Sequence, residues 1–290
     1  MGTDRGSIKL LMREGSREKF SGHALTIGRQ DICPVTPLVF KRWAQDMGFE
    51  LKKPVTGARV TDVDLFLSAG FDNIDSLDYS DFEKCTIIHD LNKDVPVNLH
   101  GKYDLIFDGG TSEHVFNLPK VLENYHKMLK AGGRIIHFLP STNCVEHGFY
   151  MFSPTLFWDY YSANNWEIKD SLFVKYSRYG NNYLMDAYKY VPGCLDRLSY
   201  GGLGKNIYYV FFVVKKTDTS TFNASIQQGQ YLKRWPGAQA AKDAQSKRSD
   251  SLKKVAAMLP ERLRSALYLL YRFIVLKIPL KFHLKLIGRY

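Results

Sequence analysis

The sequence predicts an α/β fold in which a mostly parallel sheet is covered by helices on both faces. Three observations support this fold: short strands alternate with amphipathic helices, the strands are apolar almost throughout, and polar residues follow them directly. Strands separated by helices form parallel sheets, and continuous apolar strands indicate burial on both faces. Ligands of such sheets bind beyond the carboxyl ends of the strands.

Six short segments rich in β-branched or aromatic residues are predicted as strands. They cover residues 23–27, 74–77, 86–89, 103–107, 134–139 and 208–214. Helices are predicted from apolar residues at helical spacing and from capping residues, such as Thr61 before the second helix. They cover residues 36–47, 62–68, 117–130 and 154–163. We expect Gly132 and Gly133 to separate the third helix from the fifth strand, and Pro140 to end that strand.

The residues that follow the strands predict a polar ligand crevice. Gly28 follows the first strand, and Asp78, Asp90 and Asp108 follow the second, third and fourth. Aspartate also favours turns and helix caps, which is the alternative explanation for each of them alone. Three acidic strand ends in one chain favour a cofactor crevice.

Positive charge is concentrated at the end of the chain. The 290 residues carry a net charge of +11, and residues 231–290 hold 14 Lys and Arg against 3 Asp and Glu. The remaining 230 residues are therefore neutral, so we expect no nucleic-acid partner. With 45% apolar and 24% charged residues, the chain has the composition of a globular protein. We predict one domain over residues 1–228, a linker over 229–257 and a basic amphipathic helical tail over 258–290.

The predicted tail combines an apolar run with regularly spaced cations. Residues 266–276 are apolar except Arg272, and Arg264, Lys277 and Lys281 flank that run. The run is too short to span a bilayer, but apolar surface beside Lys and Arg suits an interfacial helix on an anionic membrane. Docking on the body of the protein and a homo-oligomer contact remain open alternatives.

The cysteines and the N-terminus predict a cytoplasmic protein, peripheral on the inner face of the membrane if the tail binds lipid. Four isolated cysteines, without a C-x-x-C pair, fit a reducing compartment. Residues 1–20 carry charges throughout and have no apolar core of a secretory signal.

Residues 103–115 and 128–134 carry a family resemblance. The first segment reads Tyr-Asp-Leu-Ile-Phe-Asp-Gly-Gly-Thr-Ser-Glu-His-Val, and the second reads Met-Leu-Lys-Ala-Gly-Gly-Arg. Together they resemble the second half of a class I S-adenosylmethionine-dependent methyltransferase. The aromatic loop at residues 149–154 resembles the bacterial surface-glycan (polysaccharide or lipopolysaccharide) methyltransferases within that family.

The resemblance implies a Rossmann-like, doubly wound, mostly parallel seven-stranded sheet with a C-terminal helical extension. It also implies S-adenosylmethionine as the cofactor. The implied reaction is methyl transfer to a hydroxyl, that of a sugar in a surface glycan or its lipid-linked precursor.

The sequence departs from the family at the glycine loop after the first strand. Of the expected Gly-x-Gly-x-Gly only Gly28 is present, followed by Arg29 and Gln30. Either these two side chains bind the cofactor, with Arg29 on its methionine carboxylate, or binding is lost and the domain is an inactive interaction scaffold. The missing glycines also argue against a nicotinamide-dependent oxidoreductase.

Cofactor roles follow from position in the resemblance. Asp78 is expected on the ribose hydroxyls, with Tyr79 on the adenine face, and Asp90 on the adenine amino group beside the Leu91 amide. The methionine end is assigned to Asp108, Gly109 and Gly110.

Acceptor-side roles are assigned to two turns. His147 is the first candidate for a general base, because the loop after the fifth strand presents acceptor-side groups in this fold. His114 is the second candidate, with a purely turn-holding role as its alternative, and Glu113 orients the cofactor or the turn. Tyr150 and Phe152 are candidate substrate contacts. We expect no metal, because the Asp-Asn pair expected after the fifth strand is absent.

Overall fold

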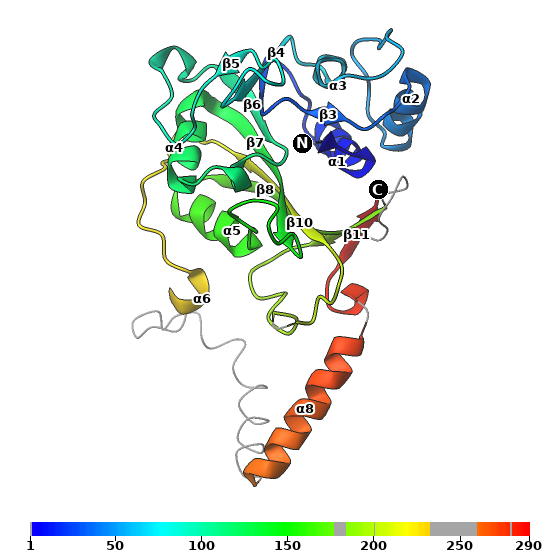
Figure 1. The fold of residues 1–290 in the computed structure, drawn as a ribbon, viewed down its shortest axis with the longest axis vertical. Coiled ribbons are helices and arrows are strands. Elements are labelled where there is room, and N and C mark those ends of the chain that lie inside the picture. Colours follow the sequence, from blue (N-terminus) through cyan, green and yellow to red (C-terminus); the bar gives the residue numbers. More distant parts are fainter. Residues whose placement is uncertain (1, 177–183, 200, 233–259, 279) are drawn as a thin grey trace.

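The computed structural model describes residues 2–176, 184–199, 201–232, 260–278 and 280–290 (Figure 1). Its described part is built around a mixed sheet of nine strands in the order β11-β9-β8-β10-β7-β6-β2-β4-β5. The strands are β2 (His23–Ile27), β4 (Asn73–Asp78), β5 (Ile87–Ile88), β6 (Tyr103–Asp108), β7 (Leu129–Thr142), β8 (Glu167–Tyr176), β9 (Met185–Lys189), β10 (Tyr208–Lys215) and β11 (Leu286–Arg289). A separate parallel pair joins β1 (Gly2–Thr3) to β3 (Asp31–Ile32).

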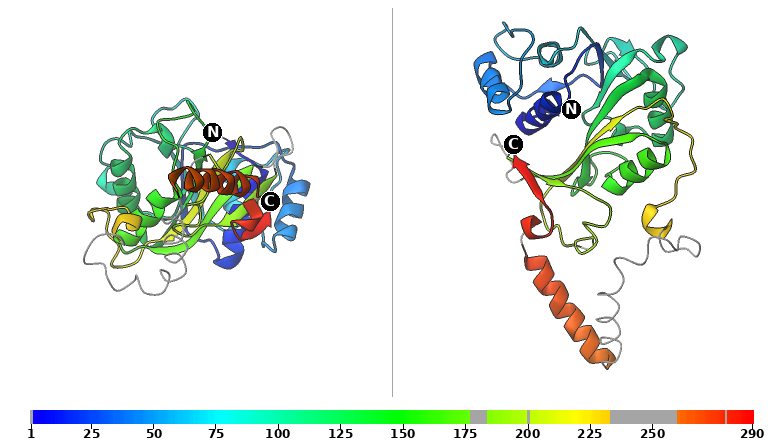
Figure 2. Two further views of the ribbon diagram at one scale, coloured as in Figure 1. Left: turned by 90° about the horizontal axis from the view of Figure 1, so that it is seen from below. Right: turned by 180° about the vertical axis from the view of Figure 1, so that it is seen from behind.

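Helices cover both faces of the sheet (Figures 1 and 2). One face carries α1 (Arg5–Arg17), α2 (Pro37–Asp46) and α3 (Asp62–Ala69), and the other carries α4 (Leu118–Met128) and α5 (Pro154–Ala163). Short 3-10 turns η1 (Val97–Leu99), η2 (Ser112–His114) and η4 (Leu280–Phe282), a one-turn helix α6 (Gly229–Leu232) and the helix α8 (Glu261–Lys277) complete the described elements.

The strand order places a topological switch point between β2 and β6. From β2 the chain adds β4 and then β5 on one side, and it returns to add β6 and then β7 on the other, all as parallel pairs. At such a reversal the connecting segments diverge and leave a crevice outside the carboxyl ends of the two central strands. The crevice therefore lies beyond Ile27 and Asp108.

The sheet differs from the predicted one in size and in direction. It has nine strands instead of seven, and it is mixed because β10 runs antiparallel to β7 and β8 while β9 runs antiparallel to β8 and β11. The predicted Rossmann-like, doubly wound arrangement is found in the parallel part of the sheet, strands β5, β4, β2, β6 and β7. The two additional strands, β9 and β11, extend the antiparallel half.

Most predicted elements are present, with shifts at their ends. The strand His23–Ile27 and the helix Pro154–Ala163 have the predicted bounds, and Thr61 caps α3 in a capping box with Asp64. The predicted helix 117–130 ends earlier, at Met128, because Leu129 already pairs with Tyr103 of β6. The following strand continues through Pro140 to Thr142, since β10 pairs with it to that point.

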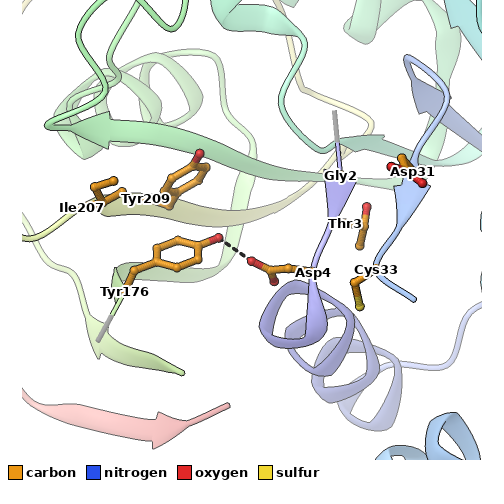
Figure 3. Close-up of a pocket in the computed structure, with 8 residues that line it drawn as sticks. All are labelled: Gly2, Thr3, Asp4, Asp31, Cys33, Tyr176, Ile207 and Tyr209. Carbon is orange, nitrogen blue, oxygen red and sulfur yellow. Dashed lines mark hydrogen bonds between the residues drawn. The ribbon is translucent and has the colours of Figure 1, made fainter. Parts of the chain in front are cut away.

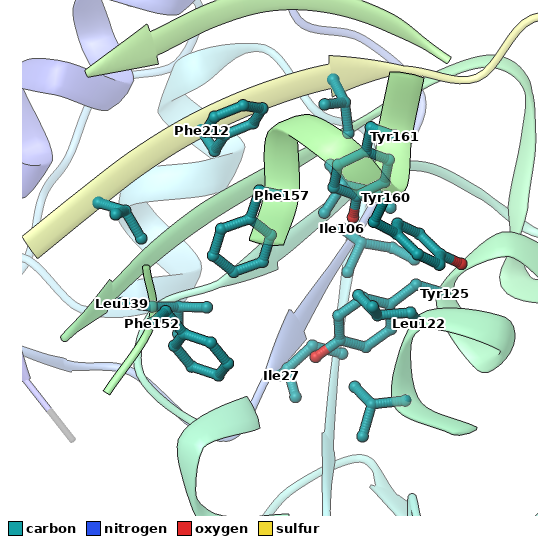
Figure 4. Close-up of a cluster of buried hydrophobic side chains, with 14 of the residues drawn as sticks. Ile27, Ile106, Leu122, Tyr125, Leu139, Phe152, Phe157, Tyr160, Tyr161 and Phe212 are labelled. Atoms are coloured by element: carbon teal, nitrogen blue, oxygen red, sulfur yellow. The ribbon is translucent and has the colours of Figure 1, made fainter. Parts of the chain in front are cut away.

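Two apolar layers sandwich the sheet, and β7 shows their alternation. Ile135 and Leu139 face the layer under α4 and α5, whereas Ile136 and Phe138 face the layer under α1 to α3. Figure 4 shows the first layer, where aromatic side chains of α4 and α5 pack on the strands. His137, between these apolar residues, is polar and fully buried, and it packs against Phe157 and Tyr161 of α5.

The predicted tail consists of the helix α8 and a following segment that joins the sheet as β11. α8 projects from the body (Figures 1 and 2). Apolar side chains along this helix are exposed. The chain then forms β11 beside β9, where Arg289 pairs with Asp186 and the Tyr290 side chain is buried. The expectation of a wholly helical tail is therefore corrected, because its last residues complete the sheet edge. No helix among the described residues is long and apolar enough to cross a membrane. Most of the predicted linker, residues 233–257, lies outside the described residues.

Candidate functional site

Gly28 and Asp78 meet at the switch point. Gly28 has a φ angle of +73°, which an L side chain rarely adopts, and its amide donates to the Leu77 carbonyl at 2.7 Å. A Cβ atom built on Gly28 would lie 3.6 Å from Oδ2 of Asp78 and 2.8 Å from Oγ1 of Thr111. The glycine therefore keeps the space in front of the half-buried Asp78 carboxylate open.

Thr111 locks the two central strands together at this edge. Its hydroxyl donates to the Ile27 carbonyl at 2.7 Å, so the turn after β6 is tied to the end of β2. Sequence reasoning missed this residue, because a threonine in a turn carries no signal of its remote partner.

The two residues after Gly28 are held by the protein itself. Nη2 of Arg29 lies 2.9 Å from the buried carboxylate of Asp62, at the start of α3. Gln30 is buried: its Oε1 accepts from Thr3 at 2.9 Å, and its Nε2 donates to the Ile27 carbonyl at 3.1 Å. Their predicted contacts with a cofactor remain predictions, and both side chains brace the loop.

The end of β5 supplies a second carboxylate. Asp90 accepts from the amide and the side chain of Asn92, and Oδ2 lies 3.6 Å from Nζ of Lys93. The hydrogen bonds from Asn92 lower the pKa of Asp90. Leu91 is buried, whereas Tyr79, beside Asp78, is exposed. Asp78 and Asp90 thus lie at adjacent strand ends, as predicted from the sequence.

Asp108 turns inward, away from the position predicted for it. It is fully buried, binds the Ser112 hydroxyl, and lies 3.0 Å from Nδ1 of His137, whose Nε2 lies 2.6 Å from the Tyr161 hydroxyl. Burial raises the pKa of Tyr161 well above its usual value. The expected contact with the methionine end is corrected, because η2 and β7 occupy this carboxylate.

The two glycines after Asp108 are needed for packing and turning. A Cβ atom on Gly109 would lie 2.6 Å from Oε1 of Gln30, and Gly110 has a φ angle of +109°. Both are buried. Their contacts with a cofactor remain predictions.

A loop places His147 over Glu113. The Glu113 carbonyl accepts from the amides of Phe149 and Tyr150, at 2.7 and 3.2 Å. A Cβ atom on Gly148 would lie 2.8 Å from that carbonyl oxygen, so only glycine permits this approach. Nε2 of His147 consequently lies 3.5 Å from Oε1 of Glu113.

His114 joins the same cluster from η2. Its Nε2 lies 3.9 Å from Oε1 of Glu113, and its ring centroid lies 5.2 Å from that of His147. Burial, followed by the field of His147, lowers the pKa of His114. Burial, followed by the charge of Asp108, raises the pKa of Glu113 to about 8. The structure therefore brings together the three residues predicted for the acceptor side.

The two predicted substrate contacts differ in burial, since Tyr150 is half-buried and Phe152 lies in the core. The Tyr150 hydroxyl donates to the Phe116 carbonyl at 2.6 Å. Phe152 is 2% exposed and packs against Phe157 in the core. The expectation that Phe152 faces a ligand is therefore corrected, because the loop 143–153 folds back onto β7.

A cavity of about 310 Å³ lies near this loop, between the N-terminus and the ends of β8 and β10 (Figure 3). Its walls combine carboxylates with aromatic rings, and the Tyr176 hydroxyl donates to Oδ2 of Asp4 at 2.8 Å. The lining residues are Gly2, Thr3, Asp4, Asp31, Cys33, Tyr176, Ile207 and Tyr209. Sequence reasoning missed them because they converge from distant segments.

Cys144 connects this cavity to the histidine cluster. Burial raises the pKa of its thiol, the charge of Glu113 raises it further, and a hydrogen bond with Tyr209 opposes the shift. The Cys144 side chain therefore interacts with Glu113 of the cluster and with Tyr209 of the cavity wall. The cavity, Glu113 and the switch point line one continuous edge of the sheet.

No protein-family model and no curated protein matches the chain. Solved structures to which the chain is similar include TehB from Haemophilus influenzae, with a TM-score of 0.34 and 12% identity over 67% of this chain and 57% of TehB. A geranyl diphosphate methyltransferase in complex with SAM has a TM-score of 0.38 and 10% identity, over 72% of this chain and 84% of its own. The N-methyltransferase NodS from Bradyrhizobium japonicum WM9 has a TM-score of 0.36 and 11% identity, over 72% and 94%. This chain thus spans little more than half of TehB.

Proposed function

We propose that the protein is an S-adenosylmethionine-dependent methyltransferase that methylates a hydroxyl group. The observation that carries this proposal is the approach of Gly28 to Asp78 at the switch point, where a bare α-carbon faces a half-buried carboxylate. This is the place at which doubly wound sheets bind nucleotide-like ligands. A carboxylate with two acceptor oxygens matches the vicinal hydroxyls of a ribose.

The residues of this edge fit the cofactor in part. Gly28 and Asp78 suit the ribose, and Asp90, with the amide of Leu91, suits the adenine edge. Asp90 keeps acceptor capacity beside its bonds to Asn92, because each carboxylate oxygen has two lone pairs.

S-adenosylmethionine would supply an electrophilic methyl group, whose bond to sulfur breaks as a bond to the acceptor oxygen forms. The protein has to orient the acceptor and take up its proton. The loop after β7 brings His147 next to Glu113 and His114 of η2, and both imidazoles are partly exposed. We assign proton uptake to this cluster, with His147, from the loop after β7, as the first candidate for the base.

A sugar hydroxyl is the acceptor that the neighbouring cavity suits best. Carboxylates of Asp4 and Asp31 offer acceptors to hydroxyl groups, and Tyr176 and Tyr209 offer rings for the apolar faces of a pyranose. The aromatic loop at residues 149–154, which resembles that of surface-glycan methyltransferases, also supports a glycan acceptor. We therefore propose a glycan or its lipid-linked precursor as the substrate.

An activity assay tests this proposal. The full-length protein is incubated with S-adenosylmethionine and a panel of glycans, and the products are analysed by intact mass. We expect one acceptor to gain the mass of one methylene group, and His147→Ala to slow that gain at neutral pH. Methylation of amines alone, with sugars unchanged, would contradict the assignment of the acceptor.

A second candidate function is an inactive Rossmann-like scaffold. Arg29 pairs with Asp62, and Gln30 accepts a hydrogen bond from Thr3. This candidate is favoured because both side chains of the divergent loop then bind other protein groups in place of a cofactor. A scaffold would bind neither S-adenosylmethionine nor its demethylated product, so a binding measurement separates the two candidates.

We also propose that α8 lies on an anionic membrane surface on the cytoplasmic side. Apolar side chains along α8 are exposed, among them Leu267, Leu270 and Ile274. Arg264 in the first turn of α8 and Lys277 as its last residue add positive charge at the two ends of the helix. An exposed apolar helix flanked by cations suits the interface of anionic lipid, which would bring the enzyme to lipid-linked substrates. A homo-oligomer that buries α8 is the competing outcome.

A further inference from the structure

Glu113, His114 and His147 converge as a set of metal ligands. One carboxylate oxygen and two imidazole nitrogens all lie within 4.8 Å of one another. The shortest separation, 3.5 Å between His147 Nε2 and Glu113 Oε1, is close to the spacing of neighbouring ligands around a tetrahedral zinc ion. Small side-chain rotations suffice to bring the third nitrogen to the same centre.

The state of Glu113 is the second, independent observation. Its side chain is fully buried, yet neither carboxylate oxygen has a hydrogen-bond partner among the described residues. Burying an unpaired carboxylate costs several kcal/mol, so such a group requires a partner. The Glu113 main chain is fixed by the amides of Phe149 and Tyr150, and Gly148 packs on its Cγ atom. The loop therefore holds this carboxylate under the two histidines.

The local charge also favours a cation. Asp108, at the end of β6, is a second fully buried carboxylate a few residues before Glu113, so the region holds two buried acidic groups. Asp108 itself is bonded to Ser112 and lies beside His137, which leaves Glu113 as the carboxylate directed at the loop. A divalent ion at the cluster would compensate for both carboxylates.

We propose that Glu113, His114 and His147 bind a divalent first-row transition-metal ion, with zinc as the best fit. Imidazole nitrogens suit zinc, cobalt and iron, whereas magnesium prefers an all-oxygen environment. Two histidines and one glutamate leave at least one coordination position open. Because His114 and His147 are 42% and 36% exposed, that position faces the solvent side of the loop.

A bound ion would give the proton-uptake cluster a more specific role, and that role rests on the proposed function. A hydroxyl group bound to the ion has a lowered pKa and loses its proton to bulk water. His147 is then a metal ligand, with its Nε2 bound to the ion, in place of a free general base. The proposed site departs from the sequence-based expectation of no metal, because it uses other residues than an Asp-Asn pair.

Metal binding to chelator-treated, full-length protein tests the inference without an acceptor. We expect one equivalent of Zn²⁺ to bind in calorimetry, with release of protons, and Co²⁺ to give a visible absorption band of low-symmetry coordination. Glu113→Gln and His147→Ala should each weaken Zn²⁺ binding roughly a hundredfold. Glu146→Gln removes a glutamate charge next to His147 in the sequence, and Cys144→Ser removes a thiol in the same loop. Neither residue is a proposed ligand, so both variants should bind Zn²⁺ like the wild type.

Several outcomes would overturn the site. The first is that the wild type does not bind one equivalent of Zn²⁺. The second is that Glu113→Gln and Glu146→Gln bind Zn²⁺ with equal affinity, and the third is that Cys144→Ser no longer binds it. Thermal unfolding of each variant shows whether a loss reflects the ligand set or the fold. Binding of S-adenosylhomocysteine is measured on the same protein samples. If the protein binds Zn²⁺ but not this cofactor product, the proposed function is contradicted and the metal site is not. If it binds the cofactor product but not Zn²⁺, the metal site is contradicted and the proposed function is not.

Discussion

Nε2 of His147 lies 3.5 Å from Oε1 of the buried Glu113, although the two residues come from different loops at the edge of the sheet. The approach depends on Gly148, whose bare α-carbon packs on the Glu113 main chain. The cluster is therefore built by main-chain contact first and by side-chain chemistry second.

Gly148→Ala tests that contact. The added methyl group would meet the Glu113 carbonyl at 2.8 Å, so the loop has to move and the hydrogen bonds of the Phe149 and Tyr150 amides should lengthen. We expect these two amides to exchange with deuterium roughly tenfold faster, the result of a local loss of about 1.4 kcal/mol. Val145→Ala, an exposed change in the same loop, should leave their exchange unchanged. Unaltered exchange in Gly148→Ala would show that the loop is held by other contacts.

Asp170 predicts an acid-sensitive fold. Burial opposes its ionisation, but hydrogen bonds from Lys189 and Arg13 outweigh burial and lower its pKa to about 2. Its carboxylate also lies 2.8 Å from Nη1 of Arg17, so α1, β8 and β9 are tied together. Because the folded-state pKa is depressed, this stabilisation is complete above about pH 4 and is lost as the pH falls towards 2.

Asp170→Asn measures this contribution. Removing this carboxylate takes away the shared partner of Lys189, Arg13 and Arg17 and leaves Glu14 alone to pair with the two arginines, so we expect the free energy of unfolding at pH 7 to fall by about 3 kcal/mol. The difference between variant and wild type should shrink below pH 4. Denaturant unfolding at pH 7 and pH 3 provides the comparison, with the exposed Glu83→Gln as a control that changes stability little. A pH-independent difference would contradict the assigned ionisation.

Asp31 tests the sugar cavity. It is exposed, it lines the cavity, and replacing it by alanine removes an acceptor for a sugar hydroxyl without disturbing the core. Ligand-observed NMR with methyl α-mannoside and methyl β-glucoside should show contacts with the wild type, weakened roughly tenfold in Asp31→Ala. Glu83→Gln, far from the cavity in sequence, again serves as the control. If neither glycoside contacts the wild type, the cavity is not a monosaccharide site.

The helix α8 tests membrane association. Replacing both Leu267 and Leu270 by glutamate places two charges on one exposed apolar stripe, whereas Ser265→Glu adds a charge on another side of the helix. We expect the double variant to lose at least roughly tenfold in partition onto phosphatidylglycerol vesicles, and Ser265→Glu to lose less. Unchanged partition, together with a change in oligomeric state by light scattering, would favour the homo-oligomer contact.

Local signals made much of the fold predictable. Thr61 marks the start of α3, Pro154 marks that of α5, and the strand His23–Ile27 follows from its apolar run. The helix α1 escaped prediction because Arg13 and Arg17 resemble a solvated face, yet they pair with the buried Asp170. Pairings as remote as that of β9 with β11 leave no local pattern in a single sequence.

The candidate site shows the same division. The carboxyl ends of parallel strands meet at one edge, so the closeness of Gly28 to Asp78 was predictable from strand order. The same rule failed for Asp108, because His137 of β7 and Ser112 of η2 bind its carboxylate in the interior. Which way a strand-end carboxylate points depends on such tertiary partners.

Cofactor binding is the central claim, and Asp78 is the residue on which it depends most. Calorimetric titration of the full-length protein with S-adenosylhomocysteine should give one saturable site. Asp78→Asn should weaken it roughly tenfold to a hundredfold, since a charged hydrogen bond contributes about 1.5–3 kcal/mol, whereas the exposed Asp81→Asn should bind like the wild type. Absence of binding at ligand concentrations of about 1 mM, or equal affinity of the Asp78 and Asp81 variants, would contradict a cofactor site at the switch point.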